Sequence, residues 1–97
     1  MTQDLTIRDC LLAIKRHFGV TFTEVDGYPQ TFGFKNQKVS MKIYRQPDGQ
    51  IRMQIIPLDD VINDKYPDIN NLNDLFRALE PWRSVIETKQ LNLFGAW

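Results

Sequence analysis

Apolar residues recur at helical spacing near the start of the chain. The apolar stripe consists of Ile7, Leu11, Ile14 and Phe18, with Cys10 beside it. This spacing predicts a helix over residues 7–18, because it places the large apolar side chains on one face. Thr6 and Asp9 have the spacing of a capping box, with Asp in place of Glu, and Gly19 is expected just beyond the last helical residue.

Two runs of alternating apolar and polar residues lie within residues 38–58, on either side of the turn sequence Pro47-Asp48-Gly49. This alternation predicts two paired strands, and a three-residue loop places Tyr44 opposite Arg52 and Met41 opposite Ile55. In that register one face carries Val39, Met41, Ile43, Met53 and Ile55. The other face carries Ser40, Lys42, Tyr44, Arg52 and Gln54. Register and hydrophobic pattern therefore agree.

The remaining segments show shorter patterns. Residues 20–25 and 28–35 predict two further strands, with a turn at Asp26-Gly27 between them. Residues 57–71 predict a loop with a helical turn near residues 59–64. Residues 70–89 have a helical stripe that Asn70 or Asn71 can cap. Pro81 interrupts this stripe, so we expect a kink there or a break that opens a second short helix.

The predicted fold class is α+β, with the elements in the order α-β-β-β-β-α. We expect an antiparallel four-stranded sheet with an N-terminal and a C-terminal helix, both on one face, because each helix has one apolar stripe to bury. Residues 1–89 are expected to form a single domain, and residues 90–97 a C-terminal tail. The pattern leaves the order of the strands open.

Composition and charge restrict the function classes. The chain of 97 residues has 12 basic and 12 acidic side chains, so its formal net charge is zero. This balance argues against a dedicated nucleic-acid-binding protein that relies on phosphate contacts. There is no stretch of about 18 apolar residues and no signal-peptide pattern. With a lone cysteine as well, we expect a cytoplasmic protein that does not insert into a membrane.

A constellation of catalytic or metal-binding residues is not apparent. His17, the single histidine, follows Cys10 by seven residues, so the two are about 10 Å apart along a helix, too far for a hydrogen bond. We therefore interpret Cys10 as a core residue and His17 as a cation at the helix end. Asp59, Asp60 and Asp64 lack the loop glycine and the terminal glutamate of a calcium-binding hand. We expect no enzyme activity, no cofactor and no metal.

The polar face of the predicted sheet is a candidate binding surface. Lys42, Tyr44 and Arg52 would be neighbours there, and basic groups next to an aromatic ring can bind single-stranded nucleic acid. The simpler interpretation is an ordinary solvent-exposed sheet face, because the net charge of zero gives such a patch no support.

The chain closes with a short apolar sequence, QLNLFGAW. Residues 90–94 of it, QLNLF, resemble the bacterial sliding-clamp-binding motif, which many replication and repair proteins carry at or near a terminus. Gln90, Leu91, Leu93 and Phe94 match its four usual anchor positions, and Asn92 occupies its variable position. The resemblance covers five of the 97 residues. It implies that Leu93 and Phe94 enter an apolar pocket of the clamp and that Gln90 fixes the orientation of the peptide.

Two hypotheses follow from this tail. In the first, the protein is a small non-enzymatic interaction module that docks on the bacterial DNA sliding clamp. It either recruits another molecule to the clamp or competes with other proteins that bind the clamp. In the second, the tail packs on the domain as a continued helix or an extra edge strand. The protein would then be an interaction, adaptor or phage-type regulatory domain, with nucleic-acid binding only indirect or weak. The oligomeric state is open under both.

Overall fold

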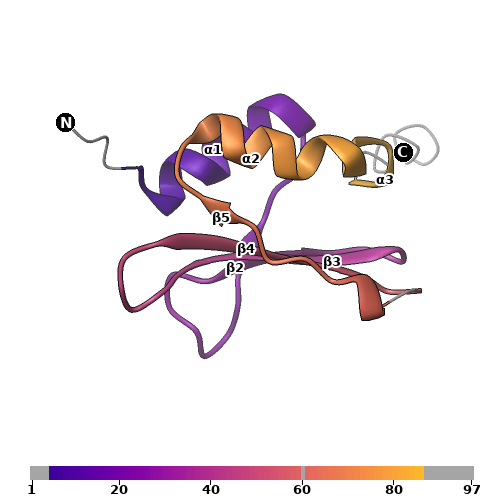
Figure 1. The fold of residues 1–97 in the computed structure, drawn as a ribbon, viewed down its shortest axis with the longest axis horizontal. Helices are drawn as coiled ribbons and strands as arrows, with labels where there is room; N and C mark the ends of the chain where they lie inside the picture. Colours follow the sequence, from indigo (N-terminus) through magenta and orange to yellow (C-terminus); the bar gives the residue numbers. More distant parts are fainter. Residues whose placement is uncertain (1–4, 60, 87–97) are drawn as a thin grey trace.

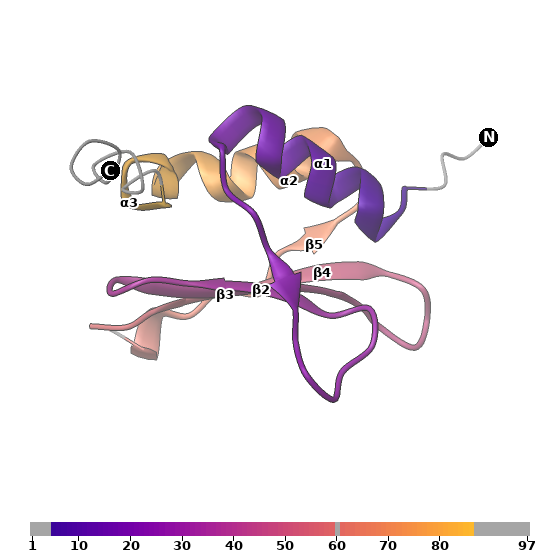
Figure 2. The ribbon, with the colours of Figure 1, turned by 180° about the vertical axis from the view of Figure 1, so that it is seen from behind.

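The computed structural model describes residues 5–59 and 61–86 (Figure 1). The elements in chain order are α1 (Ile7–Phe18), β1 (Thr23–Glu24), β2 (Phe32–Lys35), β3 (Val39–Arg45), β4 (Ile51–Pro57), the 3-10 helix η1 (Val61–Asn63), β5 (Asp68–Ile69), α2 (Leu72–Leu79), the 3-10 helix η2 (Glu80–Trp82) and α3 (Arg83–Ile86). Helices α1, α2 and α3 lie in one layer over one face of the sheet and leave the opposite face uncovered (Figures 1 and 2). This confirms the predicted α+β class.

The sheet has five strands instead of the four predicted, in the order β1-β2-β3-β4-β5. Every described pairing is antiparallel. Because the strand order follows the chain order, each strand pairs with its neighbours in the chain. The additional strand, β5, lies within residues 57–71, which we predicted as a loop. A strand of two residues is too short to show alternation, and its assignment depends on pairing with β4.

The β3–β4 hairpin has the predicted register. Tyr44 lies opposite Arg52, and Met41 lies opposite Ile55. Both strands alternate between buried and partly buried positions over most of their length, with the buried residues toward the helices. The side chains of Val39, Met41, Ile43, Met53 and Ile55 are all buried. The period-two pattern therefore specified which face of the hairpin the helices cover.

The helix ends also follow from local chemistry. The Thr6 side chain accepts from the Asp9 amide and the Asp9 carboxylate accepts from the Thr6 amide, which completes the predicted capping box. Gly19 has φ 70°, in the left-handed region that favours glycine, and ends α1. Asn71 caps α2. Pro81 lies in η2, which separates α2 from α3 and confirms the predicted break.

The core lies between the sheet and the helices. Its buried side chains in the described segments are Ile7, Cys10, Ile14, Phe18, Val20, Phe22, Val39, Met41, Ile43, Ile51, Met53, Ile55, Ile69, Leu75, Leu79 and Ile86. β1 is shorter than the strand predicted over residues 20–25, because Val20 and Phe22 are part of this core where the chain passes from the helix layer to the sheet.

Two polar side chains connect distant parts of the fold. Asn36, between β2 and β3, donates from Nδ2 to the carbonyl oxygen of Val85 in α3 at 3.0 Å. Its Oδ1 accepts from the amides of Lys38 and Val39 at 2.7 and 2.9 Å. Arg83, the first residue of α3, lies against the last turn of α1, where its Cζ is 4.5 Å from the ring centroid of Phe18. These contacts hold α3 against the β2–β3 connection and against α1.

Candidate functional site

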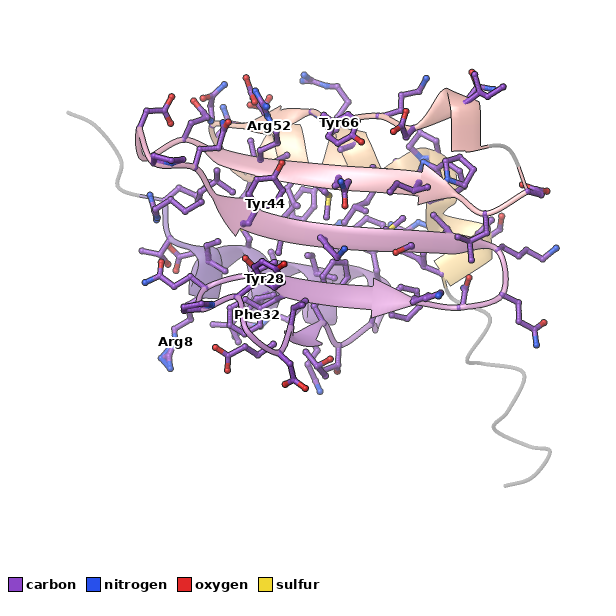
Figure 3. The ribbon with its side chains drawn as sticks, turned by 90° about the horizontal axis from the view of Figure 1, so that it is seen from below. Arg8, Tyr28, Phe32, Tyr44, Arg52 and Tyr66 are labelled. Atoms are coloured by element: carbon purple, nitrogen blue, oxygen red, sulfur yellow. The ribbon has the colours of Figure 1, made fainter. Side chains whose placement is uncertain are left out.

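The strand register brings the predicted residues Lys42, Tyr44 and Arg52 together on the face of the sheet away from the helices. Figure 3 shows Tyr44 and Arg52 on this face. Tyr44 on β3 is directly opposite Arg52 on β4, and Lys42 is opposite Gln54, one pair further along the same face. The three side chains are partly buried by their neighbours rather than fully exposed. The hairpin register alone is sufficient to place them here.

A carboxylate that the sequence did not indicate also lies on this face. Asp68 on β5 is opposite Arg52, and its Oδ1 accepts from Arg52 Nε at 2.9 Å. This hydrogen bond raises the pKa of Arg52, so the guanidinium stays charged while its charge is balanced. The pair is partly exposed, with 34% and 47% of the two side chains accessible. The cationic character of the face is therefore smaller than the sequence suggested, which weakens the case for nucleic-acid binding.

A second polar pair lies beside this one. Tyr66, in the segment leading into β5, donates from its hydroxyl to Asp64 Oδ2 at 2.7 Å. This hydrogen bond raises the pKa of Tyr66, and a hydrogen bond with Gln54 partly opposes the shift. Tyr44 and Tyr66 thus lie on a face that has both hydrogen-bond donors and acceptors (Figure 3). Its mixture of acidic and basic groups differs from the mainly basic surfaces that contact phosphates.

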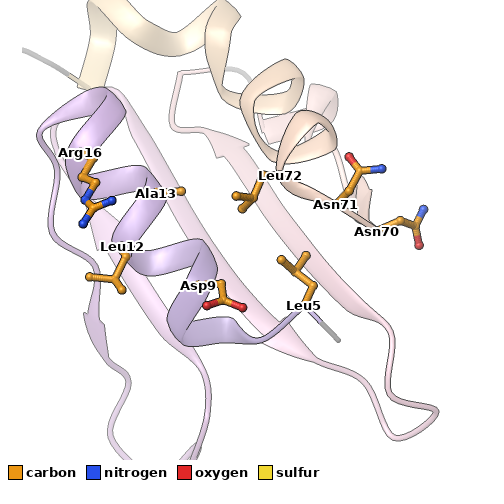
Figure 4. Close-up of a pocket in the computed structure, with 8 residues that line it drawn as sticks. All are labelled: Leu5, Asp9, Leu12, Ala13, Arg16, Asn70, Asn71 and Leu72. Carbon is orange, nitrogen blue, oxygen red and sulfur yellow. The ribbon is translucent and has the colours of Figure 1, made fainter. Parts of the chain in front are cut away.

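A hollow of about 510 Å³ lies between the side of α1 and the N-terminal end of α2 (Figure 4). It is lined by Leu5, Asp9, Leu12, Ala13, Arg16, Asn70, Asn71 and Leu72. Two of its polar groups already serve the helix ends, because Asp9 accepts from the Thr6 amide and Asn71 accepts from the Asp74 amide. We call this hollow the α1–α2 hollow. Few of its polar groups are therefore free to bind a ligand.

A more apolar groove of about 670 Å³ lies between the segment 65–67, which leads into β5, and the helices α2, η2 and α3. We call it the β5–α2 groove. Its lining residues are Ile55, Lys65, Tyr66, Pro67, Arg77, Ala78, Pro81, Trp82 and Val85. Apolar side chains form most of the wall, while Lys65 and Arg77 are both exposed. Sequence reasoning missed the groove, because its two walls come from segments that meet only in the fold.

The residues considered for catalysis are separated in the structure. Cys10 is completely buried, and burial, with a smaller contribution from Asp9, raises the pKa of its thiol to about 11. His17 is exposed and its ring stacks on Phe76, with 4.2 Å between the ring centroids. Cys10 is therefore part of the core, and its thiol is not ionised near neutral pH.

Within residues 5–59 and 61–86 no three His, Cys, Asp or Glu side chains are grouped so that they could hold a metal ion. None of the helices in the same segments is both long enough and apolar enough to cross a membrane. The predicted clamp-binding residues Gln90, Leu91, Leu93 and Phe94 lie outside the described residues.

Comparison of the chain with protein-family models, with curated proteins and with solved structures finds no match.

Proposed function

We propose that this protein is a small interaction module that docks on the bacterial DNA sliding clamp through Gln90, Leu91, Leu93 and Phe94. The proposal is supported by the resemblance of these residues, at all four anchor positions, to the clamp-binding motif. In this role the folded domain is the effector, and the tail determines where it acts. The protein either recruits the domain to the clamp or excludes other proteins that use the same peptide groove.

The position of the motif in the sequence, close to the last described helix, supports the proposal. The last described helix, α3, ends at Ile86, and the motif begins at Gln90 after only three intervening residues. In the sequence, the motif therefore follows closely after the last described helix. When the motif is bound to the clamp, the short connection limits how far the domain can move from the clamp.

The chemistry of the motif fits recognition by a preformed groove. Leu93 and Phe94 are adjacent large apolar side chains, and such anchors supply most of the binding energy of a short peptide. Gln90 adds a donor and an acceptor that can fix the direction of the peptide. Binding requires the peptide to become ordered, which lowers the affinity and allows exchange with competing peptides.

Isothermal titration calorimetry with a purified bacterial sliding clamp tests the proposal. The wild-type protein is compared with the double variant Leu93→Ala/Phe94→Ala, and all proteins are melted by circular dichroism. The double variant Leu58→Ala/Ile62→Ala is a matched control, because both residues are exposed apolar side chains of the folded domain. We expect micromolar binding by the wild type and by the control, and loss of binding by the tail variant while its melting curve shows that it is still folded. Absence of binding by the folded wild type contradicts the proposal.

A further inference from the structure

The β5–α2 groove lies along an open edge of the sheet. β5 is the last strand in the order β1-β2-β3-β4-β5, so one of its sides faces no further strand within the described residues. Lys65 exchanges two backbone hydrogen bonds with Ile55, and the Pro67 carbonyl accepts from the Met53 amide. Because the pattern alternates in antiparallel pairs, the backbone groups of Tyr66 and Asp68 point away from β4. They are available to an additional strand.

The groove provides apolar sites next to this edge. Pro67 and Ile55 belong to the sheet side of the groove, and Ala78, Trp82 and Val85 belong to the helix side. A volume of about 670 Å³ lies within the range of pockets that hold a small-molecule ligand, so there is room for apolar side chains. An open strand edge beside an apolar groove binds an extended peptide in a known way, with main-chain hydrogen bonds along the edge and alternate side chains in the groove.

The chain itself supplies a suitable peptide at this place. Val85 lines the groove and α3 ends one residue later, at Ile86, so the chain leaves α3 beside the groove. Leu91 follows Ile86 by five residues, which allows a reach of up to about 17 Å in an extended chain. Leu91 and Leu93 are alternate residues and would lie on the same side of a strand. Both length and pattern therefore fit.

We propose that the β5–α2 groove binds residues 90–94 of the same chain as an additional edge strand, with Leu91 and Leu93 in the groove. This site needs no other protein. Its consequence for function rests on the proposed clamp binding: Leu93 cannot occupy the groove and the clamp together, so the domain competes with the clamp for its own tail. Exchange between the two sites then controls when the protein docks.

Peptide binding measured by NMR tests the groove without any clamp. The full-length variant Leu91→Ser/Leu93→Ser/Phe94→Ser keeps the groove and loses the apolar anchors, and it is labelled with 15N. The probe is the unlabelled peptide TKQLNLFGA, which is residues 88–96, and the control peptide has serine in place of both Leu91 and Leu93. We expect saturable shifts at Lys65, Tyr66, Ala78, Val85 and the Trp82 indole with the first peptide only. We expect much smaller shifts in the wild type, whose own tail occupies the groove.

Blocking the groove tests the competition. Ala78→Arg places a long charged side chain in the β5–α2 groove, and Ala13→Arg makes the same change in the α1–α2 hollow. We expect Ala78→Arg to bind the clamp about tenfold more tightly than the wild type, as when an inhibited state holds about nine-tenths of the molecules. Ala13→Arg should bind like the wild type. Melting curves show whether both variants fold, and the peptide titration uses neither substitution.

The outcomes separate the two proposals. If the peptide causes no shifts in the groove, or the same shifts as the control peptide, the groove proposal is wrong whatever the clamp does. If the wild type forms a dimer that the tail variant does not form, the occupant is the tail of a second copy and the intramolecular assignment is wrong. If the groove shifts are seen and no variant binds the clamp, the groove assignment holds and the proposed clamp function fails.

Discussion

Arg83 donates from Nη1 to the backbone carbonyl oxygen of His17 at 3.2 Å, which joins the first turn of α3 to the last turn of α1. The carbonyl groups at a helix C-terminus lack partners within the helix, so an arginine there satisfies one of them and complements the helix dipole. The same guanidinium lies 4.5 Å from the ring centroid of Phe18. One side chain therefore connects two helices that are far apart in the sequence.

Replacing Arg83 should destabilise the fold measurably. Arg83→Ala removes the hydrogen bond to the His17 carbonyl and the contact with Phe18, and we expect a loss of about 1–2 kcal/mol in the free energy of unfolding. Arg83→Lys keeps a cation near Phe18 but loses the planar donor geometry, so its loss should be smaller. Urea unfolding of the three proteins gives the values. Equal stability of Arg83→Ala and the wild type contradicts the structural role.

The ion pair between Arg83 and Glu80 predicts a pH dependence. The Arg83 guanidinium donates to both carboxylate oxygens of Glu80, at 2.9 and 3.1 Å, and lowers the pKa of Glu80 from its ordinary 4.5. A lowered folded-state pKa stabilises the fold above 4.5, and this contribution is lost as the pH falls through the folded-state value.

Glu80→Gln isolates that contribution. The variant cannot ionise at this position, so its melting temperature should fall less steeply between neutral pH and acid pH than that of the wild type. Asp48→Asn, in the exposed β3–β4 turn, is the control and should keep the wild-type profile. The prediction is contradicted if Glu80→Gln and the wild type lose stability in parallel as the pH falls.

Burial of Cys10 predicts a protected thiol. The thiolate is the form that reacts with iodoacetamide, and burial raises the pKa of Cys10 to about 11. We expect the native protein to resist alkylation at neutral pH and the denatured protein to react fully, as read by intact-mass spectrometry. Because the folded-state pKa is raised, the fold loses stability as the pH rises from 9.0 toward about 11. Rapid alkylation of native Cys10 contradicts its assignment to the core.

Asp68 controls the charge of the exposed sheet face. Asp68→Asn leaves the charge of Arg52 unbalanced next to Lys42 and Tyr44, so any binding of single-stranded DNA should become stronger and more dependent on salt. Fluorescence anisotropy with a labelled oligonucleotide at two salt concentrations measures both changes, and Asp48→Asn again serves as control. We expect weak binding by the wild type. Tight binding with a steep salt dependence in the wild type would favour nucleic acid as a direct partner.

Local signals made much of this fold predictable. The β3–β4 register followed from alternation and turn chemistry, which both selected the pairing of Tyr44 with Arg52. The start of α1 followed from Thr6 and Asp9, and the break after α2 followed from Pro81. In each case residues close in the sequence determine the conformation, so one sequence contains the necessary information.

The features that were missed depend on contacts between distant residues. β5 forms because residues 65–69 pair with β4. A segment of so few residues is too short for its sequence pattern to predict a strand. Asp68 therefore could not be placed beside Arg52 in advance. The β5–α2 groove has the same origin, since Pro67 and Trp82 become neighbours only when α2 packs over the sheet edge. The candidate site is thus less predictable than the scaffold that holds it.

The sequential order of the strands has a kinetic consequence. Each strand after β1 pairs with the strand before it in the chain, so forming the sheet requires closure only of the loops between consecutive strands. Domains with such local connectivity fold faster than those whose sheets join distant segments. We expect the β3–β4 hairpin, with its short turn and seven paired positions, to form first. We expect the sheet to assemble outward from it, with docking of α1 as the later step because α1 must reach α2 and α3 across most of the chain.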